Sequence, residues 1–111
     1  MKKVISLGEI MLRLSPANDL RFLQTECLDA VFGGSEANVA VVLSQLGQPA
    51  AFVTKLPDNV VGEMALQVLR RYGVDTSAVI RGGKRLGIYF LEKGSSSCSS
   101  ICTYDRAHSA I

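Results

Sequence analysis

The sequence has few of the residues that support covalent or metal chemistry. Its 111 residues contain no tryptophan, one histidine and three cysteines, and the formal net charge is only +2. Cys27, Cys98 and Cys102 are odd in number and show no spacing typical of a metal site. So small a charge gives no reason to expect a nucleic-acid partner. We therefore expect a reduced, cytoplasmic protein that does not bind nucleic acid.

Long apolar runs are also missing. Met1-Lys2-Lys3 is followed by only a short apolar stretch before Gly8, which does not fit a signal peptide. No window approaches the length of a membrane span, so no membrane partner is expected. Because 48% of the residues are hydrophobic and 20% are charged, the chain can still form a packed core.

The usual motifs of catalysis and nucleotide binding do not occur. There is no Walker loop, no G-x-G-x-x-G and no H-E-x-x-H. Gly82-Gly83-Lys84 lacks the Walker glycine spacing and the following Ser or Thr, so it predicts a turn. The lone His108 is expected to be exposed to solvent. We find no nucleophile–base pair and expect no catalytic or metal-binding residue among these 111.

Apolar patterns predict alternating strands and helices. Strands of the buried type are expected over residues 3–7 and 50–56, a largely buried helix over 36–46 that ends at Gly47, and a second helix capped by Asp58 or Asn59 that ends at Gly73. Short extended pieces are expected around Phe22-Leu23 and Ala30-Val31-Phe32. The strand–helix–strand–helix order predicts an α/β fold with parallel strands.

A hairpin is predicted near the end of the sequence. Residues 86–92 alternate, with Ile88 and Phe90 on one face and Tyr89 and Leu91 on the other. A serine-rich tip over 95–100 and a returning strand over 101–104 complete it. So few parallel strands with one hairpin leave sheet edges unpaired, so the sequence is expected to be the front of a larger domain.

Gly33-Gly34-Ser35-Glu36-Ala37-Asn38-Val39-Ala40 sets two glycines against the start of a helix. Glycines let the backbone pass close to a ligand, and a helix start offers unpaired N–H groups. If Ser35 is the cap, Asn38 is the third helical residue and its amide lies at that open end. The pattern suits a small oxygen-rich ligand, although taken alone an ordinary loop-to-helix turn is the simpler interpretation.

Polar groups on the predicted hairpin also suit binding. Tyr89 places a hydroxyl in an apolar strand, and Tyr104-Asp105-Arg106 sets a phenol, a carboxylate and a guanidinium in a row. Arg106 can hold a substrate carboxylate by a two-pronged contact that lysine cannot copy. The alternative is that Asp105 and Arg106 form a surface pair of little energetic value. Both interpretations stay open at this point.

Five segments together resemble the amino-terminal part of the 2-keto-3-deoxygluconate kinases, among the ribokinase-like (PfkB) carbohydrate kinases. They are Gly8-Glu9-Ile10-Met11-Leu12-Arg13-Leu14-Ser15-Pro16, Arg21-Phe22-Leu23-Gln24, Gly33 to Ala40, Gly87-Ile88-Tyr89-Phe90-Leu91-Glu92-Lys93-Gly94 and Tyr104-Asp105-Arg106. The glycine pair marks only the superfamily, whereas Met-Leu-Arg-Leu-Ser-Pro and Tyr-Asp-Arg point to the keto-deoxy sugar acid branch. The resemblance covers essentially the whole chain.

The resemblance implies a fold and a set of binding residues. Residues 1–111 would be the amino-terminal part of one α/β kinase domain, with a ribokinase-like Rossmann-type core and a small β-sheet lid whose strands lie within 9–33 and 86–104. The substrate-binding residues it implies are Gly34, Ser35, Glu36, Ala37, Asn38, Tyr89, Tyr104, Asp105 and Arg106. Arg13 stands where fructokinase-like relatives carry an aspartate, which favours an acidic sugar.

The implied activity is ATP-dependent phosphorylation of 2-keto-3-deoxygluconate. ATP and Mg²⁺ would bind outside these residues, next to a catalytic aspartate in a later Gly-Ala-Gly-Asp motif, so the 111-residue chain alone is expected to be inactive. Pairing of two copies through the lid is a further implication. The alternatives are a kinase for a neutral sugar such as fructose, and a non-catalytic remnant that only binds ligand or self-associates.

Three residues depart from the family's usual pattern. Leu86 stands where a threonine is usual, Ser35 where a glycine or small apolar residue is usual, and His108 where a glycine is usual. The first removes a hydroxyl next to the predicted lid strand.

Overall fold

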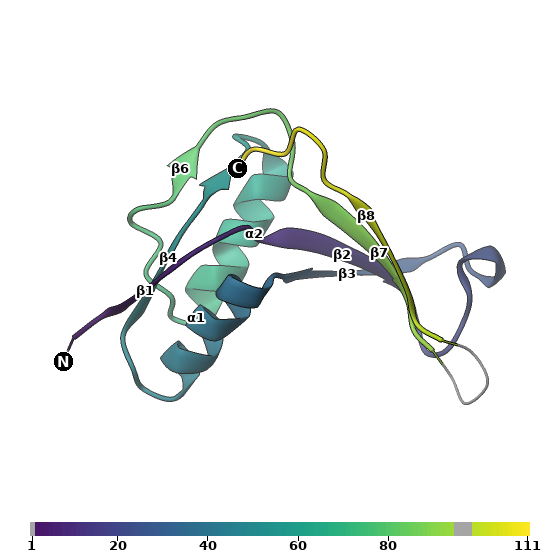
Figure 1. The fold of residues 1–111 in the computed structure, drawn as a ribbon, viewed down its shortest axis with the longest axis horizontal. Coiled ribbons are helices and arrows are strands. Elements are labelled where there is room, and N and C mark those ends of the chain that lie inside the picture. The colour runs from purple at the N-terminus through teal and green to yellow at the C-terminus, as the bar shows by residue number, and fades with distance from the viewer. Residues whose placement is uncertain (1, 95–98) are drawn as a thin grey trace.

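The computed structural model of the protein describes residues 2–94 and 99–111, so Cys98 and most of the predicted serine-rich tip lie outside the described residues. The strands are β1 (Val4–Leu7), β2 (Met11–Pro16), β3 (Leu28–Gly33), β4 (Ala50–Val53), β5 (Lys55–Leu56), β6 (Ile80–Arg81), β7 (Ile88–Glu92) and β8 (Ile101–Asp105); the helices are η1 (Phe22–Gln24), α1 (Ser35–Gln45) and α2 (Val60–Arg71). In Figure 1, both helices lie with β1, β4 and β6 at one end of the molecule. The β2, β3, β7 and β8 strands extend away from them as a curved sheet.

The helical end is a parallel α/β unit, as the element order predicts. β1 pairs with β4 in parallel, and the short β5 and β6 strands also pair in parallel. Apolar side chains from both helices and from β4 and β5 form the core. Its buried members are Ile10, Ala37, Ala40, Ala50, Phe52, Leu56, Ala65, Leu66, Leu69, Val74 and Leu86.

The predicted end signals of the helices are confirmed. Asn59 caps α2, because its Oδ1 accepts a hydrogen bond of 3.0 Å from the Gly62 N–H. Gly73 and Gly47 follow the two helices with φ of +81° and +85°, which is the left-handed conformation that glycine adopts without steric cost.

The predicted burial of the first strand and the first helix is wrong within the described residues. Only Ala37 and Ala40 of α1 are buried, while Val39 is 52% exposed. β1 is exposed along most of its length. The reason is that β1 pairs only with β4 among the residues described. Its other edge and the outer side of α1 therefore face solvent.

Two further elements differ from their predicted form. The strand expected over 50–56 is broken at Thr54, because the chain changes partner there from β1 to β6. Phe22-Leu23 is not extended but begins the 3-10 turn η1. The Phe22 ring packs edge-on against Phe90 at a centroid distance of 6.0 Å. Phe22 is therefore apolar because it packs against a strand of the sheet, and it is not itself part of a strand.

The predicted hairpin is confirmed and belongs to a four-stranded sheet of order β3-β2-β7-β8. β7 pairs antiparallel with β8, so that Tyr89 lies opposite Tyr104. On its other side β7 runs parallel to β2, and β2 runs antiparallel to β3. β2 and β3 are joined to the helical end at Ile10 and at the start of α1.

Gly62 is predicted to be irreplaceable within α2. A Cβ there would lie 2.0 Å from the main-chain oxygen of Pro57, which cannot move without shifting the turn before the helix. We expect Gly62→Ala to lower the free energy of unfolding by about 1–3 kcal/mol, despite the better helix propensity of alanine. Gln67→Ala, on the exposed side of the same helix, is the matched control. Equal unfolding midpoints for the two variants in a denaturant titration would contradict this packing.

Candidate functional site

One face of the four-stranded sheet carries a row of polar and aromatic side chains. Arg13 on β2 lies opposite Val31 on β3 and opposite Tyr89 on β7, and Tyr89 lies opposite Tyr104 on β8. Residues in such cross-strand register share one face of the sheet. The two tyrosine rings lie 5.7 Å apart between centroids. The Nε atom of Arg13 is buried and has no hydrogen-bond partner among the described residues.

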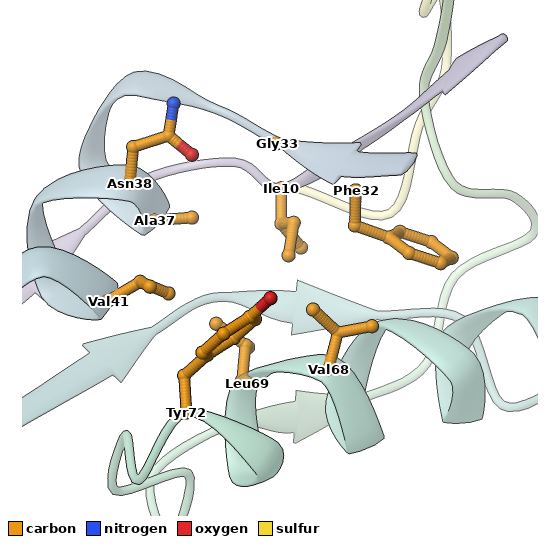
Figure 2. A pocket seen from close by; sticks show the side chains of 9 residues that line it. All are labelled: Ile10, Phe32, Gly33, Ala37, Asn38, Val41, Val68, Leu69 and Tyr72. Atoms are coloured by element: carbon orange, nitrogen blue, oxygen red, sulfur yellow. The ribbon is translucent and has the colours of Figure 1, made fainter. Parts of the chain in front are cut away.

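Tyr89 and Asn38 meet at the end of β3. A Cβ built on Gly33 would lie 3.5 Å from the Tyr89 hydroxyl and 3.8 Å from Oδ1 of Asn38. The missing side chain therefore leaves a small space between a phenol and an amide that come from distant parts of the sequence. Figure 2 shows Asn38 on the first turn of α1, beside Gly33.

Gly34 caps α1, in place of the predicted Ser35. The Asn38 N–H donates a 2.8 Å hydrogen bond to the Gly34 carbonyl, which makes Asn38 the fourth helical residue and not the third. A Cβ on Gly34 would lie 2.3 Å from the carbonyl oxygen of Glu9. The chain therefore passes so close to Glu9 that only glycine fits, and the helix starts one residue earlier than the serine predicts.

The three residues between Gly34 and Asn38 point elsewhere. Ser35 is exposed, and Ala37 is buried in the core with 2% of its surface accessible. The Glu36 carboxylate lies against Gly8, because a Cβ on that glycine would be 2.6 Å from its Oε2. Within this segment, the structure brings only Asn38 and the glycine backbone together with Tyr89.

A separate apolar cavity of about 290 Å³ lies between α1 and α2 (Figure 2). It is lined by Ile10, Phe32, Gly33, Ala37, Asn38, Val41, Val68, Leu69 and Tyr72. Its walls are mostly aliphatic, and the hydroxyl of Tyr72 points into it. It shares Gly33 and Asn38 with the polar cluster but offers few hydrogen-bonding groups to a sugar.

Arg106 is held at the other end of the polar row. Its Nη2 forms an ion pair with Oε1 of Glu9, and its Cζ lies 6.0 Å from the centre of the Tyr104 ring. Oε2 of the same glutamate accepts a 2.8 Å hydrogen bond from the Ser109 hydroxyl. The neighbouring Cys102 thiol raises the pKa of the Tyr104 hydroxyl above its ordinary value.

Asp105 lies on the opposite face of the sheet from the two tyrosines. It stands in register with Ile88, one position out of step with Tyr89. Nη1 of Arg85 donates a 3.0 Å hydrogen bond to its carboxylate, and Nη2 donates one of 2.6 Å to its main-chain oxygen. The interpretation of Asp105 and Arg106 as a surface pair is therefore wrong, because each pairs with a different residue.

Sequence reasoning missed Glu9, Ser109 and Arg85. Glu9 and Arg106 are separated by 97 positions, so no local pattern connects them. One sequence feature could have pointed to Glu9: its carboxylate stands between Gly8 and the buried Ile10, soon after the first strand. A charged side chain with only 12% of its surface exposed needs a partner.

The Gly82-Gly83 turn and the metal-ligating residue types can be followed within the described residues. The Gly82-Gly83 turn is closed by the chain itself, since a Cβ on Gly83 would lie 2.7 Å from Ala110 and one on Gly82 would lie 3.1 Å from Lys55. Both glycines of this turn are therefore packed against the chain itself. Over 2–94 and 99–111, no three His, Cys, Asp or Glu side chains gather as metal ligands. In the same ranges no helix is long and apolar enough to cross a membrane.

His108 is exposed, as predicted, and adopts a φ of +58°. That conformation is favourable for glycine and unfavourable for most other residues. It matches the glycine that the resemblance leads one to expect at this position.

Comparisons with known proteins agree with this fold. The structure superimposes on 2-dehydro-3-deoxygluconokinase from Thermotoga maritima with a TM-score of 0.97 and 55% identity, over 100% of this chain and 34% of that one. In sequence, the chain is 36% identical to 2-dehydro-3-deoxygalactonokinase from Haloferax volcanii, over 98% of this chain and 34% of the relative. It is also 36% identical to 5-dehydro-2-deoxygluconokinase from Shouchella clausii, over 91% of this chain and 32% of the relative.

The chain thus spans about a third of the length of the relatives it matches. The profile of the pfkB family carbohydrate kinases matches residues 1–111, and the mixed α/β fold is that of its ribokinase-like members. The chain belongs to the pfkB family of carbohydrate kinases.

Proposed function

We propose that these residues form the acceptor-binding part of an ATP-dependent kinase for 2-keto-3-deoxygluconate or a closely related keto-deoxy sugar acid. The observation that carries the proposal is that the Tyr89 hydroxyl and Asn38 Oδ1 lie together beside Gly33, which has no side chain to cover them. The printed names of the relatives compared above agree with this substrate class, since each is a kinase for a keto-deoxy sugar acid.

The polar groups at Gly33 suit the hydroxyls of a sugar. A phenol can donate and accept a hydrogen bond, and an amide offers both kinds of group, so together they can hold adjacent hydroxyls. Because Gly33 has no side chain to cover the Tyr89 hydroxyl and Asn38 Oδ1, a sugar lying against the Gly33 main chain could approach both groups.

The cations on the same side favour an acid over a neutral sugar. Arg106 lies over Gly87, whose Cβ would be 3.1 Å from that of the arginine, and Gly87 precedes Tyr89 by two positions on the same face. Half of the Arg106 side chain is exposed, and Glu9 pairs with its Nη2. Its other N–H donors can bind a carboxylate in a forked geometry. The unpartnered Nε of Arg13 adds a second positive group to this face.

The Tyr-Asp-Arg motif implies that Asp105 binds substrate, whereas we propose that it supports the neighbouring residues. Its carboxylate is paired with Arg85 on the far face of the sheet. There it anchors the end of β8, which fixes the position of its neighbours Tyr104 and Arg106. At the start of α1, Glu36 packs against Gly8, Ala37 is buried and Ser35 is exposed, and the groups proposed to meet the ligand are the Gly34 backbone and the Asn38 amide.

ATP with Mg²⁺ would supply the phosphoryl group, and we propose that the residues that bind it and the catalytic base lie outside this chain. The Gly82-Gly83 turn in particular does not fit a phosphate, because it is filled by Lys55 and Ala110. The role of this chain is then to bind and orient the acceptor hydroxyl. Because orientation and base catalysis are both needed for rate, the 111-residue chain alone is expected to show no turnover.

A chimera tests this proposal directly. Residues 1–111 would replace the matching third of the Thermotoga maritima kinase, to which they are 55% identical. We expect the chimera to phosphorylate 2-keto-3-deoxygluconate in a coupled assay, with kcat/KM within about a hundredfold of the parent, since an error of about 1 Å in placement costs that much. In the chimera, Arg106→Lys should raise KM for the acid by about tenfold, because lysine cannot make the forked contact.

The isolated chain is the control and should be inactive in the same assay. A chimera that folds as the parent does but shows no turnover would contradict the proposal and favour a non-catalytic remnant. A chimera that prefers fructose to the sugar acid would favour the neutral-sugar alternative.

The two adjacent glycines should respond differently to alanine. Gly33→Ala fits the fold, so its unfolding free energy should stay within about 0.5 kcal/mol of wild type. Its methyl group would fill the space between Tyr89 and Asn38, and calorimetry should show at least about tenfold weaker binding of 2-keto-3-deoxygluconate. Gly34→Ala instead pushes against the Glu9 main chain and should lose about 1–3 kcal/mol of stability. Unchanged sugar-acid affinity in Gly33→Ala would show that the site lies elsewhere.

A further inference from the structure

The Glu9 side chain is enclosed and does not lie on an open surface. Only 12% of it is exposed, whereas half of the Arg106 side chain is exposed. Both carboxylate oxygens are used, Oε1 by Arg106 and Oε2 by the Ser109 hydroxyl at 2.8 Å. A buried carboxylate with both oxygens satisfied is held firmly, so it can fix the group that it pairs with.

Two glycines make room for this carboxylate and its backbone. A Cβ on Gly87 would lie 2.8 Å from Oε2 of Glu9, and one on Gly34 would lie 2.3 Å from the Glu9 carbonyl oxygen. Gly34 caps the helix that carries Asn38, and Gly87 leads into the strand that carries Tyr89. Glu9 therefore contacts both segments that supply sugar-binding groups, as well as the arginine.

The guanidinium of Arg106 is bounded by Glu9 and by the ring of Tyr104, at 6.0 Å from its centre. An arginine on an exposed strand end otherwise samples many rotamers, and each binding event must then order it. A fixed ion pair removes part of that entropic cost and leaves the remaining N–H donors free for a ligand.

We propose that Glu9 is a positioning residue that orders the Arg106 guanidinium for the carboxylate of the sugar acid. This inference rests on the proposed function for the identity of the ligand, while the ordering of the arginine can be measured without any ligand. Glu9 acts through Arg106, so loss of its carboxylate is expected to weaken binding of the acid group more than binding of the sugar hydroxyls.

The experiment compares Glu9→Ala and Glu9→Gln with Glu92→Ala in the full 111-residue chain. Glu92 is the matched control because it also pairs with an arginine, Arg21 at 3.3 Å, and has a similarly enclosed side chain, but it lies on the other face of the sheet. Circular dichroism shows whether each variant is folded. Glu9→Gln keeps an acceptor for Arg106 and tests the role of charge if Glu9→Ala does not fold.

The first readout is the nitrogen-15 NMR signal of the Arg106 side chain in the free protein, identified by its loss in Arg106→Lys. We expect slow exchange of the side-chain N–H in wild type and in Glu92→Ala, and fast exchange in Glu9→Ala. Equal exchange in all three would overturn the inference, whether or not a sugar binds.

The second readout is calorimetric affinity for 2-keto-3-deoxygluconate and for fructose. Glu9→Ala should weaken binding of the acid by about tenfold, the order expected for losing a hydrogen bond to a charged group, and should change fructose binding little. The affinity of Glu9→Gln for the acid should lie between that of wild type and that of Glu9→Ala. Equal weakening for acid and fructose would show a merely structural role and overturn the inference. If wild type orders Arg106 but does not bind the acid, the proposed function fails while the ordering by Glu9 stands.

Discussion

The close approach of Gly34 to the main chain of Glu9 is the constraint on which the candidate site depends. With no side chain at Gly34, the start of α1 rests directly on the turn between β1 and β2. That contact places Gly33 and Asn38 at the edge of the four-stranded sheet, within reach of the Tyr89 hydroxyl. Any larger residue would move the helix away and separate the amide from the phenol.

The ion pairs of the four-stranded sheet form separate networks on its two faces. On one face Arg13 and Arg106 accompany the tyrosines, and the Glu9 carboxylate that pairs with Arg106 is enclosed. On the other face Asp105 pairs with Arg85, and Glu92 pairs with Arg21. The alternation of side chains along a strand makes this possible, since neighbours such as Tyr104 and Asp105 point to opposite sides. A run of three polar residues in sequence thus serves two separate networks.

Features that depend on a few adjacent residues were predicted correctly from the sequence. The cap at Asn59, the glycine ends at Gly47 and Gly73, and the alternation of Tyr89 with Phe90 each follow from a few adjacent residues, and all are confirmed. The burial of β1 and of α1 was predicted wrongly, because apolar character does not say whether a covering partner is present among the residues described. Ser35 was chosen as a cap by its side chain, whereas the backbone contact of Gly34 decides where α1 begins.

The partners of charged groups could not be predicted. Arg106 reaches Glu9 across 97 positions, and Asp105 reaches Arg85 across 20, distances at which periodicity carries no information. The resemblance to a kinase family implied one set of binding residues. We propose that part of this set faces the ligand and that the rest holds those residues in place.

The candidate site is defined most directly by where a sugar acid binds. The most direct measurement is an NMR titration of the 111-residue chain with 2-keto-3-deoxygluconate, following the assigned backbone amides of both faces of the sheet. We predict saturable shift changes at Gly33, Asn38, Tyr89 and Arg106, with little change at Phe22 and Phe90 on the other face. Changes centred on Phe22 and Phe90, or none at any residue up to high ligand concentration, would contradict it.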